Sequence, residues 1–291
     1  MRTIQDILQA DAARLNTALD LGAATARIEV QCLLQHILEV PRSYLLAHPE
    51  QALTTARQAL YDALLHRRLQ GEPVAYILGE REFFGLRFKV SPDTLIPRPE
   101  TELLVELALQ RIPVDGQFRV LDLGTGSGAI ALSIAHARPD AEITAVDASA
   151  AALEMARENA RQLGVANTRF VHSDWFSGLT GQRYDLIVSN PPYVAAGDVH
   201  LSQGDARFEP MSALAAGVDG LDDIRRIVAQ AGDFLERDAW LLLEHGYDQA
   251  DKVRSILQQH GFAGVMSVKD MAGIERVSGG KLQISPVFQP V

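Results

Sequence analysis

The feature that most constrains the fold is a regular alternation of short apolar segments with amphipathic ones, which begins near residue 118. The expected strands are residues 119–123, 142–147, 168–172, 185–189 and 239–244. The expected helices are residues 128–137, 150–163, 221–235 and 249–260. Short apolar strands joined by helices predict an α/β fold with a parallel, doubly wound sheet. The tail adds two expected strands, at 264–269 and 281–287.

The first 72 residues have a different, purely helical pattern, in which apolar residues recur at helical spacing in three stripes. Residues 73–99 then combine an expected short hairpin around Gly85 with a proline-rich connector. We therefore expect an N-terminal helical domain (1–72), a hairpin and connector (73–99) and a larger C-terminal domain (100–291). The helical domain is either an interaction module or a structural appendage. The pair Arg67 and Arg68 is expected on its solvated face.

Composition excludes several classes of protein. The 27 basic and 37 acidic residues give a net charge of −10, which argues against non-specific binding of nucleic acid. Cys32 is the single cysteine, so no intrachain disulfide is expected, and the eight histidines lack zinc-ligand spacing, so no metal is expected. No apolar stretch approaches the roughly 20 residues that span a bilayer, and the first residues do not resemble a signal peptide. We expect a soluble, cytoplasmic protein.

A glycine-rich turn follows the first expected strand of the sheet. It consists of Gly124, Thr125, Gly126, Ser127 and Gly128, and Asp122 lies within the strand before it. Glycines let the backbone approach a ligand, and ligands of such sheets bind at the carboxyl ends of the strands. A dehydrogenase turn has a different glycine spacing, and an acid at this position attracts an ammonium group but repels a pyrophosphate. The turn favours S-adenosylmethionine over a dinucleotide.

Two further strand ends carry candidate cofactor residues. Asp147 ends the second strand, where a carboxylate accepts hydrogen bonds from ribose hydroxyls, and its alternative role is an N-cap for the next helix, which Ser149 could fill instead. Asp174 and Trp175 follow the third strand. An acid there suits an adenine amino group and an aromatic ring packs on the base, while ordinary core packing is an equal alternative for Trp175.

The reaction is indicated by Asn190, Pro191, Pro192 and Tyr193, which follow the fourth strand. Two prolines fix φ and remove backbone donors, which leaves carbonyl groups free to accept hydrogen bonds. The Asn190 side-chain oxygen and the Pro191 carbonyl together match the two hydrogens of a planar amino or amide group, and Tyr193 offers a flat face against it. These residues predict methyl transfer to such a nitrogen, with orientation of the nucleophile as the main source of rate.

These motifs resemble those of the bacterial protein-(glutamine-N5) methyltransferases that modify peptide chain release factors. The similarity extends over almost the whole chain, and the segment Ile96–Glu102 together with a helical N-terminal domain is its most specific part. The other segments that carry the resemblance are 71–79, 82–85, 124–128, 190–193, 208–210, 213–214 and 219–221. Asn190–Tyr193 alone is shared with amino-directed DNA and RNA methyltransferases.

The resemblance implies a Rossmann-like class I S-adenosylmethionine-dependent methyltransferase sheet with an N-terminal helical domain and a short hairpin connector. It implies methylation of the glutamine in the Gly-Gly-Gln motif of class 1 release factors, which modulates translation termination. The cofactor would lie among Gly124–Gly128, Asp147, Trp175 and Asn190. Asn190–Tyr193 would hold the glutamine amide, and the helical domain would help to dock the release factor.

Several alternatives stay open at this point. A nucleic-acid methyltransferase directed at adenine N6 or guanine N2 would use the same Asn190–Tyr193 motif, although it should bring a basic groove. A non-catalytic cofactor-binding protein is disfavoured by the intact motifs. Arg98 lies between two prolines and either lines the substrate approach or pairs with Glu100 or Glu102. His245 is expected to be a strand-end residue without a catalytic role, and residues 194–220 are expected to form a lid or substrate-binding loop.

Overall fold

The computed structural model describes residues 2–283, and its chain forms two compact units. The first unit contains the residues up to Glu80 together with Ser202–Phe208. The second contains Arg81–Leu201 and the residues from Glu209 onward. The first unit thus extends past residue 72 and takes in a short segment from the C-terminal half of the sequence.

The first unit is helical. Its helices are α1 (Ile4–Leu19), α2 (Ala23–Leu38), α3 (Arg42–Ala47), α4 (Thr55–Leu69) and α5 (Val74–Leu78). Thr3 and Asp6 form a capping box that starts α1, because each side chain accepts a hydrogen bond from the other residue's backbone N–H. The apolar stripes of these helices pack into one core of their own, as their spacing predicts. No helix within residues 2–283 is long and apolar enough to span a membrane.

Arg68 corrects an expectation from the sequence, because it is buried rather than solvated. Its guanidinium donates to both carboxylate oxygens of Glu29, at 2.7 and 3.0 Å. It also donates to Asp205, at 2.9 Å, and Asp205 belongs to the short segment Ser202–Phe208. Arg67 does lie on the exposed face, where it pairs with Glu72. Adjacent residues of a helix lie about 100° apart, so Arg67 and Arg68 do not share a face, and Arg68 belongs to the buried stripe of α4 with Tyr61 and Leu65, where Glu29 is its acidic partner.

The second unit is built on a seven-stranded sheet with the order β5-β4-β3-β6-β7-β9-β8. Its strands are β3 (Arg119–Leu123), β4 (Glu142–Asp147), β5 (Thr168–His172), β6 (Tyr184–Ser189), β7 (Leu235–Glu244), β8 (Phe262–Lys269) and β9 (Glu275–Leu282). The five strands from β3 to β7 pair in parallel, and β9 is antiparallel to both β7 and β8. The expected doubly wound sheet is therefore confirmed. The expected strand at 281–287 extends into residues outside the described chain.

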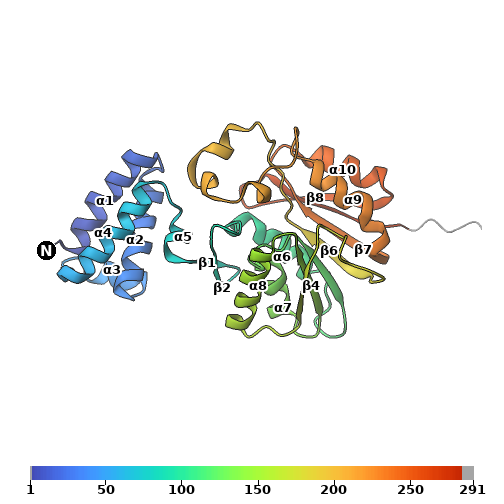
Figure 1. Cartoon of the computed structure of the whole chain (residues 1–291), viewed down its shortest axis with the longest axis horizontal. Coiled ribbons are helices and arrows are strands. Elements are labelled where there is room, and N and C mark those ends of the chain that lie inside the picture. The colour runs from blue at the N-terminus through green and yellow to red at the C-terminus, as the bar shows by residue number, and fades with distance from the viewer. Residues whose placement is uncertain (1, 284–291) are drawn as a thin grey trace, which may run out of the picture. The chain divides into compact units, whose positions relative to one another are not determined.

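Helices cover both faces of this sheet, so the central parallel strands carry apolar side chains on both faces. The helices α6 (Glu102–Leu109), α7 (Ala129–Ala137) and α8 (Ala150–Leu163) lie on one face, and α9 (Asp222–Phe234) and α10 (Ala250–Gln259) lie on the other (Figure 1). Each face contributes one apolar core. Leu121, Leu123 and Ile187 point into the core beside α9, whereas Val120 and Val188 point into the core beside α7.

The hairpin consists of β1 (Glu80–Phe83) and β2 (Leu86–Lys89), joined by Phe84 and Gly85. Both loop residues have positive φ, at 52° and 73°, as the tight two-residue turn of a hairpin requires. Hydrogen bonds attach the hairpin from its loop onward to the second unit, since Glu102 accepts from the backbone N–H of Phe84 at 2.9 Å. The side chain of Asn159 on α8 likewise accepts from Lys89 N at 2.7 Å.

The segment 194–220 is less irregular than its sequence suggested. Three short 3-10 helices lie within it, at Val199–Ser202, Gly204–Phe208 and Met211–Ala213. A bridge between Val194 and Ala215 brings its two ends together. Whether this segment behaves as a lid stays a prediction.

The buried Arg68 gives a test of the helical unit. Arg68→Ala leaves Glu29 with an unpaired, partly buried carboxylate, and removal of one partner of a buried ion pair costs about 3–5 kcal/mol. The matched control is Arg67→Ala, whose exposed pair with Glu72 contributes less than about 1 kcal/mol. Urea unfolding followed by circular dichroism measures both. Equal destabilisation by the two variants would contradict the structural role of Arg68.

Candidate functional site

The loops that carry the candidate residues meet at one edge of the sheet, at the point where the strand order reverses. From β3 the chain continues to β4 on one side, and β6 pairs with the other side of β3. Leu123 at the end of β3 is in register with Ser189 at the end of β6, and the Ser189 hydroxyl donates to the Leu123 carbonyl at 2.7 Å. The glycine turn and Asn190 therefore begin side by side, in the crevice where open α/β sheets bind ligands.

The glycine turn has a buried acid beneath it. Asp122 is fully buried, and its Oδ2 accepts a hydrogen bond from the Thr125 hydroxyl at 2.6 Å. Its other oxygen, Oδ1, is buried without a hydrogen bond from the described residues. Burial raises the pKa of Asp122 to about 7, although the Thr125 hydroxyl and the backbone N–H of Ala131 both oppose the shift. Oδ1 has the capacity to accept a hydrogen bond from a cationic group of a ligand.

Asp147 lies at the end of the neighbouring strand and faces the same turn. Its Oδ2 accepts from the backbone N–H of Gly126, and its Oδ1 accepts from that of Ser149, both at 2.8 Å. The N-cap of α8 is Ser149, whose hydroxyl accepts from Ala152 N, so capping does not explain Asp147. Each carboxylate oxygen retains a lone pair for a further donor.

The electrostatics of these two acids favour a cationic ligand. Burial also raises the pKa of Asp147, and the charge of Asp147 contributes to the raised pKa of Asp122. A positive charge near both carboxyls would stabilise their ionised forms, whereas a pyrophosphate would be repelled. S-adenosylmethionine carries an ammonium and a sulfonium group, and the residues present therefore fit it.

Trp175 lies beside the glycine turn and has positive φ, at 51°. A Cβ added to Gly124 would lie 3.4 Å from the indole ring, at van der Waals contact, and it is the positive φ of 73° that favours glycine at this position. The indole N–H donates to Asp223 at 3.2 Å, and the ring packs against the core beside α9. Asp174 instead forms an exposed ion pair with Arg226 at 2.9 Å. Of the two, Trp175 is the residue that the structure brings to the turn.

Asn190 has a defined orientation. Its amide nitrogen Nδ2 donates to the Thr101 hydroxyl at 3.2 Å, and the carbonyl oxygen Oδ1 accepts no hydrogen bond from the described residues. Oδ1 therefore retains its capacity to accept a hydrogen bond from a ligand. Thr101 lies at the end of the 3-10 helix η1 (Pro99–Thr101), which belongs to the segment that carries the most specific part of the resemblance.

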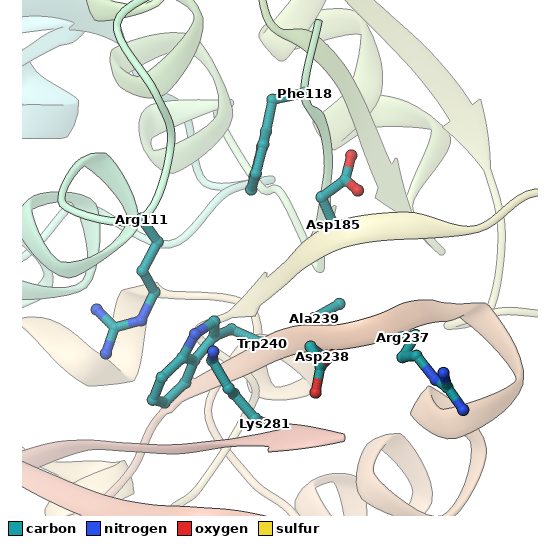
Figure 2. Close-up of a pocket in the computed structure, with 8 residues that line it drawn as sticks. All are labelled: Arg111, Phe118, Asp185, Arg237, Asp238, Ala239, Trp240 and Lys281. Carbon is teal, nitrogen blue, oxygen red and sulfur yellow. The ribbon is translucent and has the colours of Figure 1, made fainter. Parts of the chain in front are cut away.

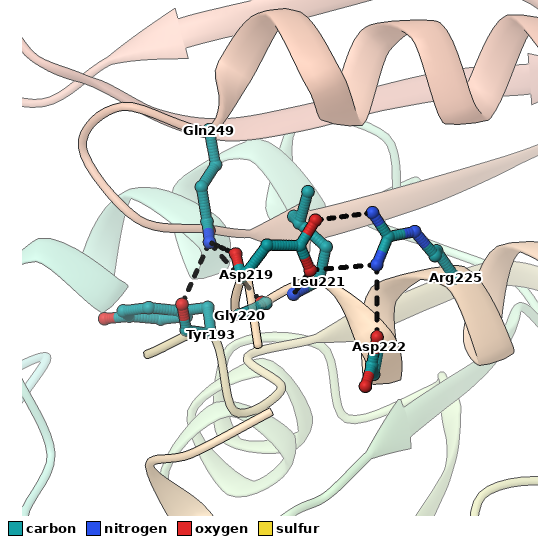
Figure 3. A network of polar contacts seen from close by, with 7 residues as sticks. All are labelled: Tyr193, Asp219, Gly220, Leu221, Asp222, Arg225 and Gln249. Carbon is teal, nitrogen blue, oxygen red and sulfur yellow. Dashed lines mark hydrogen bonds and ion pairs between the residues drawn. The ribbon is translucent and has the colours of Figure 1, made fainter. Parts of the chain in front are cut away.

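A polar network holds the backbone at Tyr193 (Figure 3). The Gln249 side chain donates to the backbone carbonyl of Tyr193 at 2.9 Å, and also to those of Asp219 and Gly220. Gly220 has no room for a side chain, because an added Cβ would lie 2.2 Å from the Tyr193 carbonyl oxygen. Arg225 binds both carboxylate oxygens of Asp219, which lowers the pKa of that acid to about 2. Residues 219–221 thus support the loop that ends at Tyr193.

Arg98 pairs with Glu209 rather than with Glu100 or Glu102. The Glu209 carboxylate is buried and accepts from both the Arg98 guanidinium and the backbone N–H of Ile96. This contact joins two segments that carry the resemblance, 96–102 and 208–210. Arg98 therefore orders the chain around the site, and its pairing with an acid far away in sequence is not visible from residue spacing.

Two side chains at the site were missed in the sequence. Glu244 ends β7 at the same edge as Asn190 and is 1% exposed, and the Tyr193 hydroxyl donates to it at 3.3 Å. A carboxylate at a strand end was the signal that singled out Asp147, and it applies equally to Glu244. Asn159 is fully buried in α8 and donates to the Ser127 carbonyl at 2.8 Å, a contact with no sequence signal. His245 is buried against Ser278, in agreement with its expected structural role.

A cavity of about 320 Å³ lies elsewhere in the second unit (Figure 2). Asp185 at the start of β6 and Ala239 and Trp240 on β7 line it, so it is at the opposite end of these strands from Asn190. The Arg111 guanidinium lies 4.1 Å from the Trp240 ring centroid in a cation–π contact. None of the predicted site residues lines this cavity.

Comparison with known proteins decides the family. The methyltransferase small domain family matches residues 100–210, and the PrmC N-terminal domain family matches residues 7–79. The chain is 49% identical over 281 residues to the release factor glutamine methyltransferase of Vibrio cholerae, with 96% of each chain covered. It is 52% identical to that of Burkholderia pseudomallei, with 94% of this chain and 96% of the other covered. The chain belongs to the release factor glutamine methyltransferase family.

Solved structures support the fold of the second unit. A Thermus thermophilus 16S rRNA N2 G1207 methyltransferase in complex with AdoMet and guanosine aligns with a TM-score of 0.54 and 21% identity, covering 70% of this chain and half of that chain. A methyltransferase from Pyrococcus furiosus aligns with a TM-score of 0.53 and 19% identity, covering 79% of this chain and all of the other. At these identities the likeness concerns the fold, and the expected Rossmann-like class I sheet is confirmed.

The glycine turn gives a matched pair of stability variants. Gly126→Ala and Gly128→Ala both place a side chain at positive φ, which costs about 1–2 kcal/mol. At Gly128 the new Cβ would also lie 2.9 Å from Leu132 and 3.2 Å from Ala156, whereas no atom lies within 4 Å at Gly126. Overpacking should add about 1–3 kcal/mol for Gly128→Ala alone. Urea unfolding measures the difference, and equal stability of the two variants would contradict this packing.

Proposed function

We propose that this chain transfers a methyl group from S-adenosylmethionine to the side-chain amide nitrogen, N5, of the glutamine in the Gly-Gly-Gln motif of class 1 peptide chain release factors. The chain is a methyltransferase of the release factor glutamine methyltransferase family. The observation that carries the assignment of its site is the pairing of Asn190 with the glycine turn across β3 and β6, with Asn190 Oδ1 left to accept a hydrogen bond.

S-adenosylmethionine supplies a methyl group on a positively charged sulfur. Gly124–Gly128 allow the backbone to approach the cofactor, and the spare oxygen of Asp122 is suited to its ammonium group. Asp147 is suited to accept from the ribose hydroxyls, since each of its oxygens holds only one backbone N–H. Trp175 would contribute an apolar face near the adenine ring. The buried acids keep the site electronegative, which favours a cationic ligand.

Asn190–Tyr193 would recognise the glutamine by its two amide hydrogens. Asn190 Oδ1 and the Pro191 carbonyl accept one hydrogen each, and Tyr193 packs its ring against the planar amide. Two fixed acceptors orient the nitrogen toward the methyl group, and such orientation supplies much of the rate of a transfer reaction. The amide nitrogen would form a bond to the methyl carbon as the sulfur–methyl bond breaks, leaving S-adenosylhomocysteine. The nitrogen would then lose one of its two hydrogens as a proton to solvent, so no strong base is needed before attack.

The helical unit is proposed to help dock the release factor. It folds around its own core, and residues 7–79 match the PrmC N-terminal domain family. It also includes Ser202–Phe208, whose Asp205 binds Arg68, and this segment lies a few residues beyond Tyr193 in the chain. A release factor bound to the helical unit would thus contact a unit that includes residues 202–208, which follow the Asn190–Tyr193 loop in the sequence.

The decisive experiment uses mass spectrometry of release factor carrying glutamine, asparagine or alanine in the Gly-Gly-Gln motif. We expect one added methyl on the glutamine form alone. Asparagine presents its amide one methylene short, and a misplacement of about 1 Å costs roughly a hundredfold in rate. Asn190→Ala should lower the single-turnover rate on the glutamine form by a similar factor or more. Duplex DNA and ribosomal RNA are incubated in parallel, and methyl transfer to either, with none to the factor, would favour a nucleic-acid methyltransferase.

Cofactor binding gives a second test. Asp147→Ala should weaken binding of S-adenosylhomocysteine by roughly 10- to 100-fold, because each hydrogen bond to a charged acceptor contributes about 1.5–3 kcal/mol. The matched control is Ser149→Ala, which removes the α8 cap at a cost of about 1 kcal/mol in stability and leaves the Asp147 carboxylate in place. Isothermal titration calorimetry measures both affinities. Equal affinity of Asp147→Ala and wild type would remove Asp147 from the proposed cofactor site.

A further inference from the structure

Glu244 is a buried acid at the site to which the proposed methyl transfer assigns no task. It ends β7 at the same edge of the sheet as Asn190. Oε1 accepts a hydrogen bond from the Tyr193 hydroxyl at 3.3 Å, while Oε2 is buried without a hydrogen bond within residues 2–283. A buried carboxyl that is only partly satisfied costs free energy, so its presence suggests a task other than packing.

Thr101 connects Glu244 to Asn190. The Thr101 hydroxyl oxygen accepts from Asn190 Nδ2 at 3.2 Å, and its own hydrogen is available to the Glu244 carboxyl, with which it interacts. A hydroxyl has a single hydrogen to donate, so the group that accepts the Thr101 hydrogen also decides whether Thr101 can accept a hydrogen bond from Asn190. Asn190 Nδ2 thus donates to Thr101, the Thr101 hydroxyl lowers the pKa of the Glu244 carboxyl, and the Tyr193 hydroxyl donates to Glu244 Oε1.

We propose that Glu244 is a positioning residue for methyl transfer, which orients Asn190 through Thr101 and holds Tyr193 directly. This inference rests on the proposed function of Asn190 and Tyr193. A carboxylate has no hydrogen to donate, so both hydroxyls must donate to it, and the Thr101 oxygen is then left to accept from the Asn190 amide nitrogen. That arrangement keeps Asn190 Oδ1, rather than Nδ2, available to the substrate amide.

The surroundings of Glu244 make this hydrogen-bonded arrangement sensitive to pH. Arg276 on β9 and the two hydroxyls lower its pKa, Glu100 raises it, and burial outweighs them to give a value of about 7. The positive charges of Arg98 and Arg276 also lower the pKa of the Tyr193 hydroxyl. The neighbouring His245 is buried, which lowers its pKa and keeps it neutral in this range. Below pH 7 the protonated Glu244 carboxyl itself has a hydrogen to donate and is a weaker acceptor for the two hydroxyls. Asn190 and Tyr193 are then held less firmly, so turnover should fall as the pH decreases through about 7.

Stability should respond in the opposite direction to activity. The pKa of Glu244 is raised from 4.5 to about 7 on folding. Between these values the native carboxyl holds a proton that the unfolded chain has lost, so the free energy of unfolding falls as the pH rises through this window. Above it, the ionised group still destabilises the native state. Glu244→Gln removes that ionisation and should leave the protein at pH 8.5 at least as stable as wild type, while a loss of structure would lower stability and rate together.

The kinetic test compares Glu244→Gln with Glu236→Gln, an exposed acid on the same strand that pairs with Arg119. The glutamine at 244 donates to one of the two hydroxyls and reverses its direction, so kcat on release factor should fall roughly 10- to 100-fold. KM for the factor should change little, and the ratio of wild-type to variant kcat should lose its dependence on pH near 7. Asp122 also titrates near 7, but it is present in both proteins and cancels in that ratio. Glu236→Gln should behave as wild type.

Thr101→Val provides a second variant, which cuts the link to Asn190 and leaves the Tyr193 contact with Glu244 in place. It should lower kcat as Glu244→Gln does, and the double variant should lower it little further. An unchanged kcat for Glu244→Gln, or a wild-type pH profile in that variant, would overturn the inference. So would additive losses in the double variant.

A readout without substrate separates this inference from the proposed function. In wild type the side-chain amide NMR signals of Asn190, assigned by their absence in Asn190→Ala, should shift with a midpoint near pH 7. They should shift much less in Glu244→Gln, where Asp122 still titrates near pH 7, and should shift as in wild type in Glu236→Gln. If release factor gains no methyl but this coupling is observed, the proposed substrate is wrong and the link from Glu244 to Asn190 stands. Absence of the coupling in wild type refutes the link whatever the substrate.

Discussion

The register between β3 and β6 is the constraint on which the functional site depends. Leu123 pairs with Ser189, and a buried hydrogen bond from the Ser189 side chain reinforces the pairing at the edge of the sheet. A slip by one residue would turn Leu121 and Leu123 from one core to the other and would separate the glycine turn from Asn190. Apolar helices on both faces make such a slip costly, so the packing of the sheet also fixes the distance between the two proposed binding elements.

Two acids, Asp122 and Glu244, are buried at that edge of the sheet. The free-energy cost of burying a carboxyl group distinguishes this site from the rest of the sheet. Asp122 and Glu244 are both buried, both have a pKa raised to about 7, and both retain one oxygen without a hydrogen bond from the described chain. They lie at the ends of β3 and β7, on either side of β6. Stability alone does not favour such groups. The proposed cationic ligand beside Asp122 and the proposed role of Glu244 in orienting Asn190 would give each acid a physical reason.

The segments that carry the family resemblance prove to be contact partners of one another. Ile96 and Arg98 bind Glu209, and the carbonyl groups of Tyr193 and Gly220 share the Gln249 side chain. These contacts do not touch the proposed substrate amide. They hold the loops on both sides of Asn190–Tyr193, which explains how short motifs scattered over more than a hundred residues serve a single site.

The sequence by itself determined the alternation of strands and helices, the bounds of β3, β4 and β5, the glycine turn and the position of Asn190 at a strand end. These features are local, since periodicity, glycine and proline act on their own stretch of backbone. Only the tertiary structure decided that Arg68 is buried against Glu29, that Arg98 pairs with Glu209, and that Thr101 and Glu244 reach Asn190 and Tyr193. Each of these pairs joins residues far apart in the chain, and the free energy of a buried charge depends on the partner that the fold brings to it.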